Sequence, residues 1–369
     1  MIHISRRAAC AGLLATALPR RAFARRALAP PDSGPLSDKA VSELLARHKV
    51  PGASLAIINE SALAASYGYG VARGEQPVEP STRFQAASIS KTINALAVLR
   101  LAALGRLGLD DPVNRHLTAW KLPDNVFTET RPVTVRMLLS HSGGTTVTVF
   151  DGYVPGRPQP SLTQILDGVH PAGNDPVRVA WPPGHAFRYS GGGITVLQQM
   201  IIDVTGETYP AAIAKLVLTP LAMAHSGYAQ SPEVLPRGEI ALAHGADGVR
   251  IAGGFRIHPE LAAAGLWTTP TDIARAVLAI IRSWHGKSGA FLPQSLARAM
   301  LTPVVQDAGL GIFMANHLFT HVGANTGYRA LFIADAATER AAVVMTNGDD
   351  GDYVCTELNR RAAEHFGWA

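Results

Sequence analysis

The sequence predicts an α/β (α+β) fold, in which an antiparallel sheet is flanked by helices and a mainly helical region is inserted between its two parts. Segments with the alternating apolar pattern of strands lie near both ends of the chain, at 53–60, 62–72 and 319–348. The chain between them has helical periodicity and proline-rich loops instead. With 369 residues, of which 47% are hydrophobic and 17% charged, the chain can bury a large core. We therefore expect the C-terminal strands to complete a sheet that the N-terminal strands begin.

The first 24 residues have the features of an export signal. Arg6 and Arg7 give a charged start, an apolar run follows at 8–18, and Ala-Phe-Ala at 22–24 forms a cleavage site. The paired arginines resemble those of a twin-arginine leader, which exports proteins already folded. The alternative is a basic, disordered tail. We expect export, and hence a periplasmic or secreted protein.

The charge of the chain gives no electrostatic footprint for nucleic acid. The formal charge is +5, but four arginines lie in the first 24 residues, which contain no acid. The remainder carries 29 basic and 28 acidic residues, so its net charge is close to zero. No later segment reaches the roughly 18 uninterrupted apolar residues that a membrane span needs. Removal of the leader would leave Cys355 as the one cysteine, which excludes an intramolecular disulfide.

Taken in order, the remaining segments alternate between helices, strands and turns. Pro51 and Gly52 end a first helix, and Glu60 and Ser61 form the turn between the two N-terminal strands. Further helices are expected at 135–140, 194–205, 211–217 and 352–367, with another that starts near residue 88 and ends before a break at 109–112. This pattern predicts three parts: the export signal (1–24), a sheet domain (34–109 with 236–369) and a mainly helical domain (110–235).

A lysine in an apolar helix is the first sign of chemistry. Lys91 lies three residues after Ser88 in the segment 84–109, which is otherwise almost wholly apolar. Residues i and i+3 share one face of a helix, about 5–6 Å apart between Cβ atoms. Burial lowers the pKa of a lysine, and such a lysine could withdraw the serine proton to create a nucleophile. The alternative is a capping serine with a lysine whose amine reaches the surface, because S-x-x-K alone is a weak signal.

Further motifs follow in a fixed order. A Y-S-x motif begins at Tyr189, about 100 residues after S-x-x-K, and an H-x-G motif begins at His321, about 130 residues later. Supporting segments are LLSHSGG at 138–144, TPLAM at 219–223 and AAGLWTTPTD at 263–272. In this order the chain resembles the penicillin-recognising serine hydrolases: class C β-lactamases, D-aminopeptidases, D-alanyl-D-alanine carboxypeptidases and their esterase relatives. The resemblance spans the chain from Leu36 onwards and implies the β-lactamase-like form of the predicted fold.

The resemblance implies a role for each of these motifs. Ser88 would be the nucleophile that accepts the acyl group, with Lys91 and Tyr189 as its partners in proton transfer. A tyrosine with a pKa near 10 is a poor base at neutral pH unless a positive charge lies beside it, which Lys91 would supply. The backbone N–H groups of Ser88 and Ala324 would form the oxyanion hole. Gly323 would let the strand backbone come close to the substrate. Taken singly, the tyrosine and the histidine could equally be core residues.

Two positions depart from the β-lactamase pattern. Gly191 stands where Y-S-N has an asparagine, whose side chain normally binds the side-chain amide of the substrate. His321 stands where K-T-G has a lysine, and a histidine of pKa near 6.5 would be a weaker, partly charged anchor for a substrate carboxylate. Both changes argue against efficient β-lactam hydrolysis and fit esterases and D-amino-acid-specific peptidases. Trp267, Phe150 and Tyr153 could line the acyl pocket, although aromatic residues are more often part of the core.

These observations predict a serine hydrolase without a metal or a cofactor. Its substrate would be a small-molecule carboxylic ester or, as the second choice, a peptide that contains a D-amino acid, with weak β-lactamase activity as a further alternative. No G-x-S-x-G or H-E-x-x-H motif is present. The glycines at 191–193 lack the pattern of a phosphate loop and are expected to form a tight turn. The alternative from a different class is a non-catalytic binding module for acylated or peptidoglycan-like ligands.

Overall fold

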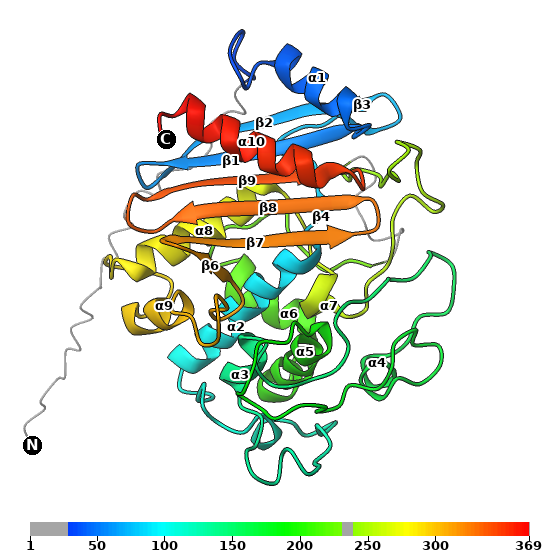
Figure 1. Ribbon diagram of the computed structural model, residues 1–369, viewed down its shortest axis with the longest axis vertical. Helices are drawn as coiled ribbons and strands as arrows, with labels where there is room; N and C mark the ends of the chain where they lie inside the picture. Colours follow the sequence, from blue (N-terminus) through cyan, green and yellow to red (C-terminus); the bar gives the residue numbers. More distant parts are fainter. Residues whose placement is uncertain (1–28, 231–238, 369) are drawn as a thin grey trace, which may run out of the picture.

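A seven-stranded antiparallel sheet is the centre of the computed structural model, which describes residues 29–230 and 239–368 (Figure 1). The strand order is β3-β2-β1-β9-β8-β7-β6. These strands are β1 (Gly52–Asn59), β2 (Ala62–Arg73), β3 (Gln76–Pro77), β6 (Phe313–Ala315), β7 (Leu318–Asn325), β8 (Tyr328–Asp335) and β9 (Arg340–Thr346). Two short strands, β4 (Phe84–Gln85) and β5 (Trp267–Thr268), pair separately. The predicted export signal and the predicted boundary at 235/236 lie outside the described residues.

The N-terminal and C-terminal strands meet in the middle of the sheet, as the sequence predicted. β1 pairs with β2 on one side and with β9 on the other, where Ala53 lies opposite Thr346. β1 is buried along nearly its whole length, which explains its continuous apolar sequence. Glu60 and Ser61 have φ values of 51° and 62°, as a two-residue type I′ hairpin turn requires.

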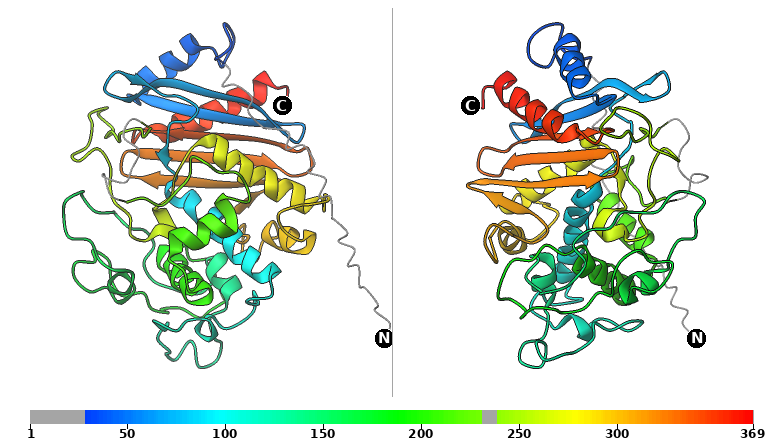
Figure 2. Two further views of the ribbon diagram at one scale, coloured as in Figure 1. Left: turned by 180° about the vertical axis from the view of Figure 1, so that it is seen from behind. Right: turned by 45° about the vertical axis from the view of Figure 1, so that its right-hand side comes forward.

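Helices cover both faces of the sheet. Alternate residues of β1 divide between two apolar clusters, because successive side chains of a strand point to opposite faces. Leu55 and Ile57 belong to the cluster that includes α1 (Asp38–Arg47) and α10 (Gly351–His365). Ala56 and Ile58 belong to the larger cluster, which includes α8 (Pro270–Trp284) and α9 (Gln294–Met300). Figure 2 shows α8 on the face opposite α10. Neither α8 nor α9 was expected from the sequence.

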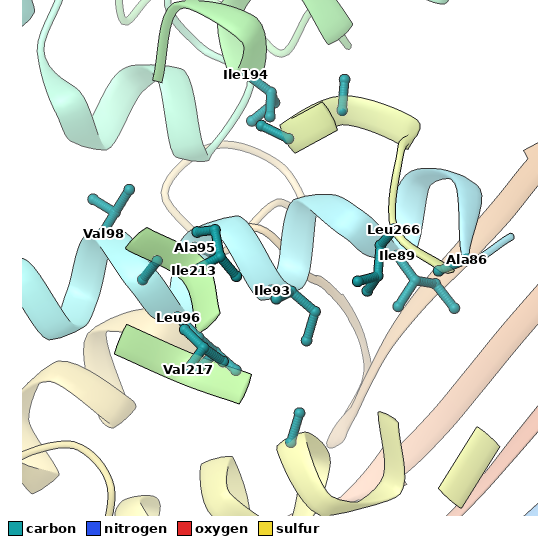
Figure 3. Close-up of a cluster of buried hydrophobic side chains, with 14 of the residues drawn as sticks. Ala86, Ile89, Ile93, Ala95, Leu96, Val98, Ile194, Ile213, Val217 and Leu266 are labelled. Carbon is teal, nitrogen blue, oxygen red and sulfur yellow. The ribbon is translucent and has the colours of Figure 1, made fainter. Parts of the chain in front are cut away.

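The larger apolar cluster continues from the sheet into a group of helices around α2 (Ser90–Ala103). The other helices of this group are α3 (Val135–Leu139), α4 (Leu162–Asp167), α5 (Gly191–Thr205), α6 (Tyr209–Ile213) and α7 (Leu261–Ala264). α5 and α7 pack on α2, while α3, α4 and α6 pack on α5. Figure 3 shows Leu96 of α2 next to Val217, while Ile194 lies on the other side of this helix. Because one core spans the sheet and the helices, the division into two domains stays a prediction. No helix within the described ranges has the length and apolarity to cross a membrane.

Three local predictions differ from the structure. The glycines at 191–193 form the first turn of α5 instead of a tight turn, because Ser190 caps this helix by accepting a hydrogen bond from the Gly193 N–H at 2.8 Å. The predicted helix at 211–217 is divided, since α6 ends at Ile213 and a π-helical turn (Ala214–Leu218) follows. Ser88 lies in a 3₁₀ turn (Ala87–Ile89) just before α2, and not in the α-helix itself.

Candidate active site

The turn that carries Ser88 is held in a strained conformation. Ala87, directly before it, is fully buried and has a φ of 48°, in the left-handed region that a residue with a side chain adopts only where its surroundings hold it. The N–H of Ala86 donates to the carbonyl of Leu266 at 2.8 Å, and the N–H of Ile89 donates to the carbonyl of Ala86 at 3.1 Å. The backbone is therefore fixed on both sides of the serine hydroxyl.

Strand β7 packs directly against this turn. A Cβ atom at Gly323 would lie 2.3 Å from the carbonyl oxygen of Ala86, so no larger residue fits there. Glycine is thus required at position 323 because β7 lies against the backbone just before Ser88. The sequence had predicted a different reason, a close approach of the strand to the substrate. Asn325 and Tyr328 pair across a two-residue hairpin loop. Because the N–H groups along an antiparallel strand point alternately towards and away from its partner, the N–H of Ala324 points away from β8. That orientation is the one a donor in the predicted oxyanion hole needs.

Lys91 is buried and its amine is bound to the Ser88 hydroxyl. Lys91 is 3% exposed, and its Nζ donates hydrogen bonds to Ser88 Oγ at 2.9 Å and to the carbonyl of Ala263 at 2.7 Å. The alternative in which the amine reaches the surface is therefore wrong. The carbonyl of Ala263, in α7, was not foreseen, because backbone acceptors leave no signal in a sequence.

Tyr189 completes the group around the serine. Its hydroxyl donates a hydrogen bond to Ser88 Oγ at 2.9 Å, and Lys91 Nζ lies 5.1 Å from the centre of its ring. The structure thus brings the three predicted catalytic side chains to one serine oxygen, although Tyr189 is 101 residues from Ser88. These distances permit proton transfer among the three groups. Their roles in catalysis stay predictions.

His141 holds the segment that carries Tyr189. Its Nδ1 accepts a hydrogen bond from the N–H of Ser190 at 3.2 Å, and its ring centre lies 4.4 Å from that of Tyr189. The Ser190 hydroxyl donates in turn to the carbonyl of Thr146 at 2.7 Å. Phe313 of β6 stacks on the His141 ring at 6.2 Å. The sequence contained His141 within the segment 138–144, but nothing there indicated a contact with the tyrosine.

Two buried histidines lie within the electrostatic influence of Lys91. The pKa of His321 is lowered to about 3, first by burial and then by the charge of Lys91, although the carbonyl of Val322, 2.7 Å from Nδ1, opposes this. The pKa of His141 is lowered well below its ordinary value by burial, Lys91 and His321, in that order. Both rings are therefore neutral near pH 7. The expectation of a partly charged anchor at His321 is wrong, because burial removes the charge.

The two other predicted substrate-binding residues are both buried. Trp267 is 1% exposed, and its ring lies edge-on to Phe255 at 5.5 Å and to Tyr328 at 5.7 Å. Trp267 is thus a core residue in this structure, which does not support its predicted contact with the substrate. Gly191 lies in the first turn of α5 beside Phe150, which is partly buried. Across 29–230 and 239–368, no cluster of three or more His, Cys, Asp or Glu residues is arranged to hold a metal ion.

The comparison with known families agrees with this geometry. The family model described as Beta-lactamase matches residues 37–365. The chain belongs to the Beta-lactamase family. This match confirms the resemblance found in the sequence motifs and the β-lactamase-like fold that they implied. It covers both the sheet and the helices around α2.

Individual relatives and similar solved structures have low sequence identity to this chain. Protein flp of Staphylococcus aureus (strain N315) is 25% identical over 332 residues, which are 86% of this chain and 63% of that protein. This chain therefore spans less than two thirds of that relative. The structure of the D-amino acid amidase from Ochrobactrum anthropi SV3 with D-phenylalanine has a TM-score of 0.72 at 22% identity, over 90% of this chain and 98% of that one. EstCE1, a hydrolase with promiscuous acyltransferase activity, has a TM-score of 0.71 at 20% identity, over 88% and 96%. At these sequence identities, similarity to solved structures shows that this chain shares their fold.

Proposed function

We propose that this protein is an exported serine hydrolase that cleaves a small-molecule carboxylic ester through an acyl-enzyme on Ser88. One observation carries the proposal: Ser88 Oγ is hydrogen-bonded at 2.9 Å to both Lys91 Nζ and Tyr189 Oη. A binding module has no need of an amine and a phenol on the same serine oxygen. Membership of the Beta-lactamase family supports a hydrolase of this kind.

In the proposed reaction the Ser88 hydroxyl attacks the carbonyl carbon of the ester. Its proton passes to the pair formed by Lys91 and Tyr189, and the pair returns a proton to the alcohol oxygen that leaves. The N–H groups of Ser88 and Ala324 stabilise the negative oxygen of the intermediate. Water then attacks the acyl-serine and gives a proton to the same pair, which restores the Ser88 hydroxyl. One ester and one water yield one alcohol and one carboxylic acid.

Two features favour an ester without a charged group. The neutral ring of His321 supplies no positive charge to a substrate carboxylate, such as that of a penicillin or a peptide C-terminus. Gly191 supplies no side-chain amide. Weak hydrolysis of β-lactams is expected for the same reasons. An amide of a D-amino acid is the second candidate, since it carries no carboxylate and the fold is shared with a D-amino acid amidase.

The test uses p-nitrophenyl acetate, with release of the phenol and the intact mass of the protein as readouts. We expect turnover that falls by about 10³-fold or more in Ser88→Ala. Ser37→Ala serves as the matched control and should keep turnover. It removes the serine cap of α1, which packs with α10 in the smaller apolar cluster. A binding module would give neither turnover nor an acyl adduct. A panel of D- and L-amino acid amides then separates an amidase from an esterase.

Export is tested on the full chain in a bacterial host. We expect the protein in the periplasmic fraction, because residues 1–24 have a charged start, an apolar run and a cleavage site. Replacement of Arg6 and Arg7 by lysine should retain the protein in the cytoplasm if the leader uses the twin-arginine route. Cytoplasmic localisation of the unmodified protein would refute export.

A further inference from the structure

The direction of a side chain at position 191 is occupied by an aromatic ring. A Cβ atom built on Gly191 lies 3.0 Å from Cε2 of Phe150 and 3.1 Å from the carbonyl oxygen of Thr148. Contacts this short are tighter than nine in ten real Cβ contacts, and the carbonyl belongs to the backbone. An asparagine at position 191, as in the Y-S-N pattern, would therefore require Phe150 to shift by a few tenths of an ångström.

The segment that presents Phe150 is anchored to the start of α5. The N–H of Gly191 donates to the carbonyl of Thr148 at 2.9 Å, and the N–H of Gly192 donates to the carbonyl of Val147 at 2.9 Å. These bonds, with the one from the Ser190 hydroxyl to Thr146, occupy the helix terminus with the loop backbone. The backbone just before Phe150 is thus held to the start of α5 by bonds that also hold the segment of Tyr189.

Val147 adds a second, independent observation. It has a φ of 62°, although a β-branched residue in the left-handed region is a genuine outlier. Such strain persists only where the surrounding structure enforces it, and it is typical of functional loops. Two residues further on, Val149 is 66% exposed, while Phe150 packs partly against the large core. The loop thus places the Phe150 ring beside Gly191, two residues after Tyr189.

We propose that Phe150 is the specificity-determining residue of the acyl site and that it selects esters of short, apolar acyl groups. The inference rests on the proposed function and names its substrate class. The ring lies where the Y-S-N pattern places an amide, so an acyl group that carries an amide finds no hydrogen-bond partner there. An acyl chain that extends towards position 191, where that amide would lie, meets the ring, so the ring limits the length of the chain. Both effects act on the acyl half of the ester, because the asparagine of the Y-S-N pattern binds the side-chain amide of that half.

The first experiment compares p-nitrophenyl butyrate with p-nitrophenyl octanoate. The ratio of their kcat/KM values should fall by about tenfold or more in Phe150→Ala, because a difference of a few methylenes in a pocket changes kcat/KM by one to two orders of magnitude. Phe127→Ala is the matched control, since Phe127 is also partly buried against the large core but lies in a different loop. Phe150→Leu, which keeps the apolar volume and loses the ring, should give an intermediate ratio and remains informative if Phe150→Ala does not fold. A ratio within twofold of the unmodified protein in both Phe150 variants would overturn the inference.

The second experiment reads the acyl site without turnover. The rate at which Ser88 is phosphonylated by p-nitrophenyl butylphosphonate or octylphosphonate is followed by intact mass, with Ser88→Ala as the blank. The same shift in the butyl-to-octyl ratio is expected for Phe150→Ala. Labelling with that shift but without ester turnover would refute the proposed function and support the inference. Labelling with no shift would refute the inference alone, and no labelling would refute both.

The third experiment exchanges the two residues. Gly191→Asn alone should lower the melting temperature, because the asparagine meets Phe150 and the Thr148 carbonyl. Addition of Phe150→Ala should recover part of this loss. The double variant should also raise the kcat/KM for p-nitrophenyl N-acetylglycinate relative to the butyrate ester by about tenfold. Equal melting temperatures of Gly191→Asn and the double variant, with an unchanged substrate ratio, would contradict the inference.

Discussion

His141 accepts a hydrogen bond from the backbone N–H of Ser190 at 3.2 Å. The bond fixes the residue directly after Tyr189, and the His141 ring lies 4.4 Å from the tyrosine ring. His141 is 3% exposed and neutral near pH 7, so it acts on the tyrosine through position and not through charge. It touches neither Ser88 nor, in the proposed reaction, the substrate. We therefore regard it as a positioning residue.

Replacement of His141 should lower kcat more than it changes KM. A displacement of the Tyr189 hydroxyl by about 1 Å is enough to lower the rate by about 10²-fold in His141→Ala. In His141→Asn the amide oxygen can take the place of Nδ1 as the acceptor, so part of the rate should return. Steady-state kinetics on p-nitrophenyl acetate measure both variants. Equal kcat values for His141→Ala and the unmodified protein would show that the tyrosine is held by other contacts.

Lys91→Met tests whether the buried amine is present for catalysis or for stability. The activity should fall by roughly 10²–10⁴-fold, because Tyr189, the proton acceptor beside Ser88, loses the positive charge of Lys91. The free energy of unfolding should be unchanged or higher, since methionine fills a similar volume without a buried charge. The pKa of His321 should rise from about 3, because the charge of Lys91 contributes to lowering it. Activity and denaturation measure the first two effects, and NMR titration of the histidine ring measures the third.

The fold and the pair Ser88 and Lys91 could be predicted from the sequence because they follow local patterns. Tyr189, 101 residues from Ser88, was found through the order of motifs that the chain shares with a known family. β1 is a continuous apolar run, the Glu60-Ser61 turn closes a hairpin, and S-x-x-K places Lys91 near Ser88 whatever the rest of the chain does. The charge state of His321 could not be predicted, because it depends on burial by residues far away in the chain. Only the packing of β7 reveals that the ring is enclosed.

The same reason explains why the surroundings of Gly323 and Trp267 could not be predicted. Each was assigned to the substrate from its place in a motif, but the structure surrounds each with protein atoms. A motif gives the order of residues. It does not say whether a residue is needed for contact with the ligand or for packing against other parts of the chain. His141 shows the opposite case, since its contact with the Ser190 N–H joins two motifs 49 residues apart.

The neutral state of His321 predicts a specific dependence of stability on pH. Its pKa is about 3 in the folded protein and near 6.5 in the unfolded chain, so between these values the unfolded state binds more protons. Stability should therefore fall as the pH decreases from 6.5 towards 3, and His321 alone should account for about 2 kcal/mol between pH 7 and pH 5. Urea denaturation at both pH values should show a smaller loss in His321→Asn. The pH profile of kcat/KM should have no inflection that this variant removes, and such an inflection would mean that the ring is charged in the folded enzyme.

Gly323→Ala tests the contact between β7 and the turn that carries Ser88 (Ala87–Ile89). The added methyl group would meet the carbonyl oxygen of Ala86 at 2.3 Å, so the strand or the turn must move. We expect a loss of about 1–3 kcal/mol in the free energy of unfolding, as overpacking of a core usually causes. We also expect a fall in kcat, because Ala86 lies two residues before Ser88.

Gly227→Ala is the control, since no atom lies within 4 Å of a Cβ built there and its φ is not in the left-handed region. Full activity and stability in Gly323→Ala would show that the turn yields freely, and the strained Ala87 would then not be what positions the serine.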